Sequence, residues 1–456
     1  MIPGLERRAP QPSGLPLVGN YPELRKNPLE FFLRAFRDHG DVVRMRFGWV
    51  EAHLLSHPAH AKYVLQEHWQ DFSKNTPGFD KLRLVLGNGL LTSEGDFWRR
   101  QRRLMQPAFH HARLEGLVEV MVKAAADLGD EWAVAARAGR VVDVAEDMMR
   151  LTLRIVAETL LGTDVTRESK DIGPAVTAVL EDVNQRAKQV FDVPQTIPTR
   201  QNRKLARALA TLDAVVLRAI AEHRQRTPSR PDLLTLLLAV KDEDTGEGMS
   251  DRQIRDEVMT IFLAGHETTA NALAWTFALL SQHPRFDGEV RDEISSVLRG
   301  ALPQFSDAAR LPRTTMVVKE SMRLYPPAWT IGRFAKQPHT FGGFRVDAGN
   351  IVFVSPYVIH RHPELWSNPE GFDPDRFTPE RESQRPRFAY FPFGGGPRIC
   401  IGNAFAMLEA QLVLATLLPR FRLELPPGHT PTVQPLVTLR PRGGLPMRVR
   451  MRDAIR

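Results

Sequence analysis

Cysteine is almost absent from this chain, because Cys400 is the only one in 456 residues. A single thiol excludes an intramolecular disulfide and any metal site that needs several cysteines. It also argues against a secreted protein held together by disulfides. The shortage therefore predicts a reducing, cytoplasmic location. It further predicts that any chemical role of Cys400 is that of a lone thiolate.

Long uninterrupted apolar runs are missing as well. The longest apolar stretch covers residues 258–280. Polar residues interrupt it at His266, Glu267, Thr268, Thr269 and Asn271. Polar groups are expensive in the middle of a bilayer, so the stretch predicts a buried helix rather than a membrane span. The first residues lack the apolar core of a signal peptide. We therefore expect no membrane anchor.

Basic tails, zinc-ligand spacings and the aromatic motifs of nucleic-acid-binding domains are absent too. The net charge is +8, from 61 Lys and Arg against 53 Asp and Glu, and the only dense basic cluster lies at residues 99–103. One short cluster predicts no nucleic-acid binding. A basic face that docks an acidic protein is a more economical explanation of the charge.

The patterning that is present indicates many helices and a few short strands. Residues 97–282 are mostly helical in pattern, whereas 42–47, 52–55 and 351–354 read as strands. Helices with segregated small sheets predict a mainly α (α+β) fold. Repeats and low-complexity linkers are absent, so we expect a single domain over 1–456. Its small β lobe would lie mainly at 40–60 and 333–356. Its helix-rich lobe, with a long central helix, would lie mainly at 90–325 and 400–420.

The residues around Cys400 form a glycine-rich run. Phe393, Gly396, Arg398, Cys400 and Gly402 are its fixed positions. Glycines let a backbone approach a flat cofactor closely, and N–H groups aimed at a sulfur stabilise its charge. Arg398 supplies a cation for a cofactor carboxylate.

This run resembles the haem-binding loop of cytochrome P450 monooxygenases, and all five positions match that family's pattern. The resemblance implies haem b, with Cys400 as the axial ligand of the iron. Two alternatives are weaker. A buried structural cysteine does not explain five matched positions, and a phosphate loop would need a following Gly-Lys-Ser/Thr.

A second motif lies in the long predicted helix, which Ser250 and Gln253 begin as a capping box. Small residues at Ala264 and Gly265 leave room on one face, and the Thr268 hydroxyl can bond the carbonyl four residues back. The acid beside it is Glu267.

The run 264–269 resembles the same family's oxygen-activation motif. The resemblance implies that Thr268 and Glu267 deliver protons during that step, a general-acid role. The alternative is a helix-packing threonine beside a buried, paired glutamate. We interpret His266 as structural.

Charged residues further along match two other family features. Glu320 and Arg323 lie one helical turn apart, and Arg376 follows downstream. An exposed pair of this type would be surface decoration. The resemblance instead implies a buried triad that fixes the cysteine loop.

Donors for the haem carboxylates follow from the resemblance as well. Trp98 and Arg102 lie four residues apart on one helix face and suit a carboxylate. Arg398 and Arg333 are the third and fourth donors by family placement. The alternatives are a core tryptophan and a surface arginine. The other arginines of the 99–103 cluster, Arg99, Arg100 and Arg103, would face solvent or a redox partner.

Substrate contacts are also carried over from the family. The predicted pocket residues are Phe79, Leu82, Leu86, Phe191, Ala328, Trp329, Ile331, Val437 and Thr438. Most are apolar, which predicts a hydrophobic small molecule. Segments 324–329, 355–358 and 437–441 look like bacterial carotenoid hydroxylases, which places a carotenoid or terpenoid above a fatty acid.

Nicotinamide and flavin fingerprints are absent, and we expect no reductase domain. NAD(P)H would therefore act indirectly, through a ferredoxin or flavodoxin with its reductase, and we expect a monomer. The expected reaction inserts one oxygen atom into a C–H bond. A peroxide-driven haem-thiolate enzyme and a non-catalytic haem sensor remain as alternatives. Glu267 and Thr268 favour the monooxygenase, because neither alternative needs a proton relay.

Overall fold

The computed structural model describes residues 7–161, 169–187, 193–225, 232–242 and 246–452. The chain folds into two compact units, and each unit is assembled from two separate stretches of sequence. Unit 1 comprises residues 1–80 and 319–400, and unit 2 comprises 81–318 and 401–456.

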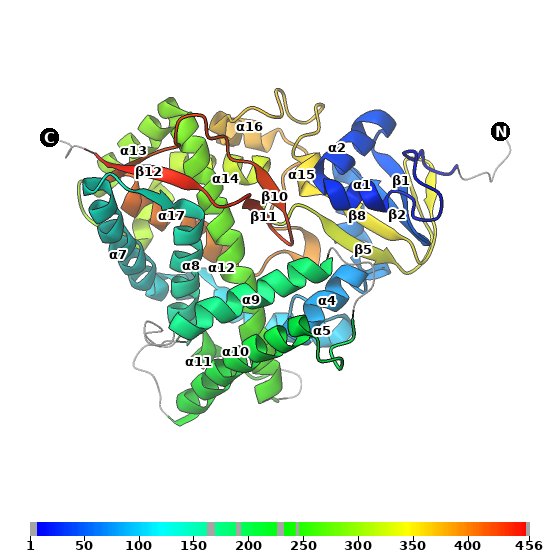
Figure 1. The fold of residues 1–456 in the computed structure, drawn as a ribbon, viewed down its shortest axis with the longest axis horizontal. Helices are drawn as coiled ribbons and strands as arrows, with labels where there is room; N and C mark the ends of the chain where they lie inside the picture. Colours follow the sequence, from blue (N-terminus) through cyan, green and yellow to red (C-terminus); the bar gives the residue numbers. More distant parts are fainter. Residues whose placement is uncertain (1–6, 162–168, 188–192, 226–231, 243–245, 453–456) are drawn as a thin grey trace. The chain divides into compact units, whose positions relative to one another are not determined.

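Unit 1 is organised around a five-stranded sheet in the order β1-β2-β8-β5-β3 (Figure 1). The strands are β1 (Val42–Phe47), β2 (Val50–Leu55), β3 (Phe72–Ser73), β5 (Ile331–Ala335) and β8 (Ile351–Val354). β2 and β8 run parallel, and the other neighbours are antiparallel. A two-stranded ribbon is formed by β6 (His339–Phe341) and β7 (Phe344–Val346). The strands predicted at residues 42–47 and 52–55 are therefore present as β1 and β2, which pair as an antiparallel hairpin.

Unit 1 also contains short helices. They are α1 (Tyr21–Lys26), α2 (Pro28–His39), α3 (Pro58–Lys62), α15 (Pro356–Ile359) and α16 (Pro379–Ser383). The Asn27 side chain caps α2, a proline opens it, and Gly40 at φ 87 ends it, as capping preferences predict. Phe31, Phe32 and Phe36 of α2 share a buried cluster with residues of β1 and β2, which fixes α2 against the sheet.

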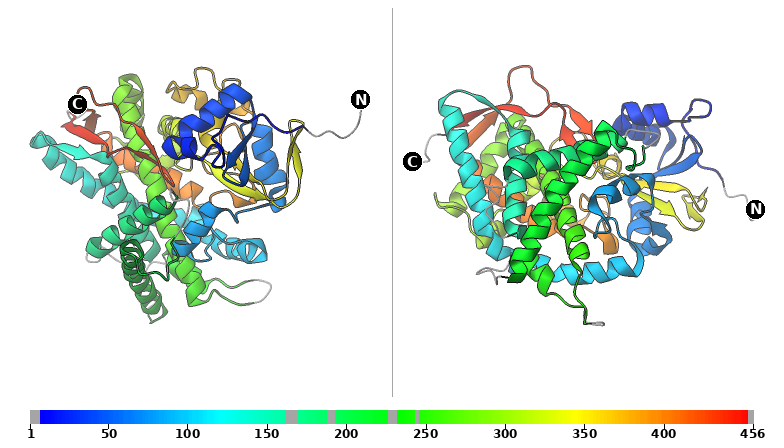
Figure 2. Two further views of the ribbon diagram at one scale, coloured as in Figure 1. Left: turned by 45° about the vertical axis from the view of Figure 1, so that its right-hand side comes forward. Right: turned by 60° about the horizontal axis from the view of Figure 1, so that its bottom comes forward.

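Unit 2 is helical. Its helices are α5 (Gly95–Met105), α6 (His111–Leu114), α7 (Val118–Arg137), α8 (Val144–Leu161), α9 (Ser169–Ala187), α10 (Arg200–Gln225), α11 (Leu233–Ala239), α12 (Asp251–Gln282), α13 (Pro284–Leu298) and α17 (Asn403–Leu417). Helices α4 (Pro77–Leu86) and α14 (Pro312–Leu324) cross the division between the units. α9 and α10 lie side by side (Figure 2).

Small β elements complete unit 2. β4 (Val141–Asp143), β12 (Pro446–Met451) and β9 (Phe421–Glu424) form a three-stranded sheet, and β10 (Val433–Pro435) pairs with β11 (Leu439–Pro441) as a hairpin. The predicted fold class, helix-rich with small segregated sheets, is confirmed.

The long central helix is α12. Ser250 and Gln253 make both hydrogen bonds of the predicted capping box, and Pro284 opens the next helix directly afterwards. α12 packs against α8, α10 and α17. Its middle is almost wholly buried, but Ala264 is exposed, and Ile261, Gly265 and Thr268 are half-buried. These residues follow the three- and four-residue spacing of one helix face, so one stripe of a core helix stays open.

Candidate active site

The Cys400 loop is held in shape by its own backbone. It contains a short 3-10 turn, Gly396–Arg398. The Cys400 N–H donates to the Phe393 carbonyl at 2.9 Å, and the Gly394 N–H donates to the Phe391 carbonyl at 2.9 Å. These closures fix the cysteine at the end of a tight loop within unit 1.

Two glycines make this loop possible. Gly396 has φ +65, and a Cβ there would lie 1.9 Å from the Leu65 carbonyl oxygen. A Cβ on Gly395 would lie 2.2 Å from the Phe388 ring. No side chain fits either position without moving the loop, because backbone atoms and a packed ring cannot yield. The loop therefore packs directly against the segment that contains Leu65.

The thiol itself is exposed. A cysteine with only a packing role is normally among the most buried residues, so the exposure of Cys400 contradicts the structural alternative. A lone exposed sulfur at the end of a rigid loop suits a thiolate ligand to a cofactor. The neighbouring Arg398 is half-buried and brings positive charge to the same loop. This donor set fits haem.

The structure brings Glu320, Arg323 and Arg376 together in unit 1. Arg323 donates from Nε to Glu320 Oε2 at 2.7 Å and from Nη2 to Oε1 at 2.8 Å. Arg376 Nε lies 3.3 Å from Oε1 as an ion pair. Arg323 also donates to the carbonyls of His360, Pro369 and Gly371. Glu320 and Arg323 have no exposed surface, so the cluster is a closed clamp on the segment that leads to the cysteine loop.

His360 links this clamp to the loop and was missed by sequence reasoning. Its carbonyl accepts from Arg323, and its Nε2 accepts the N–H of Phe391 at 3.0 Å. Burial, with Arg323 and Arg361 nearby, holds the pKa of His360 well below its usual value. The ring is therefore neutral and can accept at Nε2. The contact spans 31 residues, and no local pattern indicates it.

The predicted carboxylate donors are distributed between the two units. In unit 1, Arg333 on β5 is nearly buried at 8% exposure and donates to the Gly332 carbonyl. In unit 2, Trp98 is 4% exposed and Arg102 is half-buried, on α5. Arg333 is therefore not a surface residue.

Of the remaining arginines of α5, Arg99 and Arg103 are exposed, as expected, whereas the Arg100 side chain is only 22% exposed. Arg103 Nη2 lies 2.7 Å and Arg100 Nε 3.5 Å from Asp242, whose side chain is 1% exposed. Arg99 pairs with Asp96 at 2.6 Å. Part of the basic cluster is thus neutralised locally and ties α5 to residue 242.

On α12, the Thr268 hydroxyl donates to the Ala264 carbonyl at 2.8 Å, as predicted. Both residues lie on the open stripe of the helix. Gly265 is half-buried on the same stripe, and a Cβ there would lie 3.2 Å from Val156 on α8. Its small size therefore also serves helix packing. His266 is buried, and its Nδ1 bonds the Phe262 carbonyl at 2.7 Å, as expected for a structural residue.

Glu267 is buried and bound by residues at the far end of the chain. The Thr438 hydroxyl donates to Glu267 Oε1 at 2.5 Å, and Arg440 Nε donates to the same oxygen at 2.7 Å. Arg440 Nη2 adds an ion-pair contact at 2.6 Å. Sequence reasoning missed Arg440. Thr438, predicted as a substrate contact, is 5% exposed, and its hydroxyl donates its hydrogen bond to Glu267.

The other predicted pocket residues have different surroundings. Val437 is 37% exposed, Ala328 is exposed, and Phe79, Leu82 and Ile331 are half-buried, whereas Leu86 is buried. Trp329 packs against Phe32 with ring centroids 5.9 Å apart, so it belongs to the hydrophobic cluster of unit 1. Phe191 lies outside the described residues.

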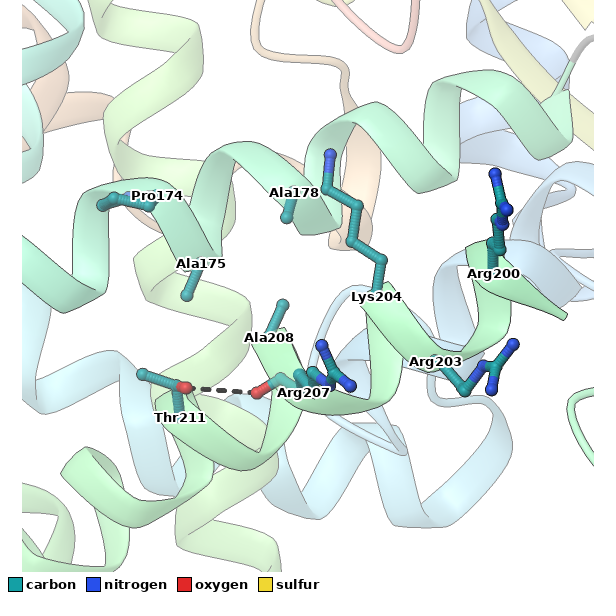
Figure 3. A pocket seen from close by; sticks show the side chains of 9 residues that line it. All are labelled: Pro174, Ala175, Ala178, Arg200, Arg203, Lys204, Arg207, Ala208 and Thr211. Carbon is teal, nitrogen blue, oxygen red and sulfur yellow. Dashed lines mark hydrogen bonds between the residues drawn. The ribbon is translucent and has the colours of Figure 1, made fainter. Parts of the chain in front are cut away.

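A separate groove lies in unit 2, with a volume of about 760 Å³. Figure 3 shows Pro174, Ala175 and Ala178 of α9 facing a row of cations on α10. The row consists of Arg200, Arg203, Lys204 and Arg207. It shares no residue with the predicted substrate pocket. Across the parts of the chain that the structure describes, no helix is long and apolar enough to cross a membrane.

Comparison with known proteins agrees with this geometry. The family model for Cytochrome P450 matches residues 9–445. The chain belongs to the cytochrome P450 family and is a monooxygenase of that class. Cyclooctatin synthase of Streptomyces melanosporofaciens is 38% identical over 95% of this chain and 94% of its own. Pentalenene oxygenase of Streptomyces avermitilis is 36% identical over 94% and 92%.

A second protein of Streptomyces melanosporofaciens, cyclooctat-9-en-7-ol 5-monooxygenase, is 36% identical over 92% of this chain and 90% of its own. Among solved structures, a cytochrome P450DA heme domain superposes with a TM-score of 0.90 at 29% identity, covering 98% of each chain. Family membership implies a haem cofactor.

Proposed function

We propose that this chain, acting as one domain over residues 1–456, hydroxylates a polycyclic terpenoid with dioxygen. The names of three relatives, cyclooctatin synthase, cyclooctat-9-en-7-ol 5-monooxygenase and pentalenene oxygenase, support this substrate class. A carotenoid is the second choice within the same class. The exposed, apolar character of Val437 and Ala328 suits a hydrophobic substrate.

The exposed thiol of Cys400 carries the assignment of the cofactor site. We propose Cys400 as the ligand of haem iron, with Phe393, Gly396 and Gly402 shaping its loop. Trp98, Arg102, Arg333 and Arg398 would hold the haem carboxylates by charge-assisted hydrogen bonds. Bound haem supplies the activation of dioxygen.

Protons for that chemistry would come through α12. Thr268 presents its hydroxyl on the open stripe of the helix, and Glu267 is the neighbouring acid. Both would act in proton delivery. Electrons would come from NAD(P)H through a separate ferredoxin or flavodoxin and its reductase, in the reducing cytoplasm that the single cysteine favours.

The first test is a visible-spectrum titration of the haem-replete protein with pentalenene, β-carotene and a long-chain fatty acid. A low-spin to high-spin shift of the Soret band with pentalenene is expected, because a bound substrate displaces water from the iron. A shift with the fatty acid alone would overturn the substrate class.

Two variants separate cofactor binding from proton delivery. Cys400→Ser should lose the thiolate-type spectrum. Thr268→Ala should keep that spectrum but form less product per NAD(P)H consumed. Retention of the wild-type spectrum by Cys400→Ser would overturn the ligand assignment. Peroxide-supported turnover as fast as the reductase-supported reaction would favour the peroxide-driven alternative.

A further inference from the structure

The carboxylate of Glu267 is held from one side only. The donors from Thr438 and Arg440 all converge on Oε1, so these contacts do not engage Oε2. Burying a carboxylate is expensive unless an opposite charge and hydrogen-bond donors contact it. Arg440 supplies the charge, and Thr438 and Arg440 supply the donors.

These two donors come from one short segment. Thr438 lies directly before β11 and Arg440 within it, and both side chains reach Glu267 Oε1. The Asn271 amide donates to the Thr438 hydroxyl oxygen at 3.0 Å, and the Trp275 indole donates to the Leu439 carbonyl at 3.1 Å. These bonds fix the register of β11 along α12, and therefore the position of both donors.

The same contacts direct Glu267 away from its neighbour. Successive residues on a helix do not face each other. Thr268 points along the open stripe to Ala264, whereas Glu267 points to β11. Proton transfer between them therefore needs either a bridging water or a movement of the Glu267 carboxylate. The contacts to Oε1 control both.

Arg440 also connects this buried acid to water. Its side chain is 25% exposed, whereas that of Glu267 is 3% exposed. The Arg440 side chain therefore reaches from the solvent to the buried carboxylate.

We propose that Arg440 and Thr438 are positioning residues for proton delivery, which hold the Glu267 carboxylate by Oε1 and leave Oε2 to exchange protons. The inference rests on the proposed role of Glu267 and names the residues that set it. Arg440 and Thr438 act through Glu267 and take no proton themselves.

The test uses holoenzyme with its reductase system and the terpene selected by the titration. Arg440→Gln should lower product formed per NAD(P)H by about three- to tenfold. That is less than the 10²- to 10⁴-fold typical of losing a general acid outright. Arg440→Lys restores the charge and should recover much of the coupling. Thr438→Val should have a smaller effect in the same direction.

A spectroscopic readout is independent of turnover. In Arg440→Gln, the infrared spectrum should gain a protonated carboxyl band that is absent from the double variant Arg440→Gln, Glu267→Gln. The matched control is Arg203→Gln, which removes the same charge from the exposed row on α10 (Figure 3). It should leave both coupling and spectrum unchanged.

The outcomes separate this inference from the function it rests on. If Glu267→Gln loses coupling while Arg440→Gln and Thr438→Val behave as wild type, the positioning role is wrong and the acid role stands. If Glu267→Gln itself keeps full coupling, the proposed proton delivery fails. A folding defect in Arg440→Gln would leave Arg440→Lys and Thr438→Val to decide. Wild-type coupling in Thr438→Val would then overturn the proposal.

Discussion

Two buried glutamate–arginine clusters, one in each unit, use the same side chains but are closed to different degrees. In unit 1, Glu320 and Arg323 form two hydrogen bonds at 2.7 and 2.8 Å, and neither side chain is exposed. In unit 2, the contacts to Glu267 converge on one oxygen, and the Arg440 side chain is 25% exposed. The first cluster is closed, and the second is open to water on the arginine side.

This difference determines what each cluster can do. Arg323 Nη1 donates to the carbonyls of His360 and Pro369, and Nη2 donates also to that of Gly371. Any movement would therefore leave buried donors without partners, which is expensive. Arg440 can exchange a protein contact for water at much lower cost. A glutamate–arginine pair that is fully buried therefore holds its surroundings in a fixed position. A pair whose arginine is partly exposed to solvent can change its contacts.

The largest expected effect is on the closed cluster. Glu320→Gln removes the negative charge opposite Arg323, which has no exposed surface. An uncompensated buried charge lowers the free energy of unfolding by about 3–5 kcal/mol. Urea unfolding followed by far-UV circular dichroism measures the change.

The control is Glu181→Gln, which breaks an exposed pair with Lys204 whose side chains are 60% and 63% exposed. Exposed pairs contribute about 0–1 kcal/mol. Equal losses of unfolding free energy in the two variants would show that the burial of the Glu320 cluster does not make it more stabilising than an exposed pair.

A substitution in the Glu267 cluster should lower the free energy of unfolding by less. Arg440→Gln leaves Glu267 with the Thr438 hydroxyl and with water that reaches the former guanidinium position. We expect a loss of about 1–3 kcal/mol, the range for a buried polar group deprived of a partner. A double-mutant cycle with Glu267→Gln isolates the pair itself, with an expected coupling of about 0.5–3 kcal/mol. A loss as large as that of Glu320→Gln would show that the second cluster is equally closed.

Sequence patterns predicted the local features of these sites well. The capping box of Ser250 and Gln253, the Thr268 bond to Ala264, and the one-turn spacing of Glu320 and Arg323 all depend on helical periodicity over at most four residues. Such features follow from helix geometry, which local sequence specifies.

Long-range partners were not predictable in the same way. The contact from Arg440 to Glu267 spans 173 residues, and that from Phe391 to His360 spans 31. Gly265 was expected to leave room on one helix face, and its approach to Val156 on α8 could not be predicted. These contacts depend on how helices and strands pack.

The smallest expected effect tests whether acid sensitivity comes from the clusters or from buried histidines. His53 on β2 has no exposed surface, and within the described residues neither ring nitrogen has a hydrogen-bond partner. Burial, with Arg44 adding to it, lowers the pKa of His53 to about 4. Below pH 6.5 the unfolded chain binds a proton there that the folded chain does not, so stability falls as pH falls. One such histidine contributes a loss of about 1 kcal/mol between pH 6.5 and 5.5.

Carboxylates of unfolded chains titrate near pH 4, below this window. Urea unfolding of His53→Leu at both pH values should therefore show a pH dependence about 1 kcal/mol weaker than that of the unaltered chain. An unchanged pH dependence would mean that His53 carries a proton, or a water, in the folded protein.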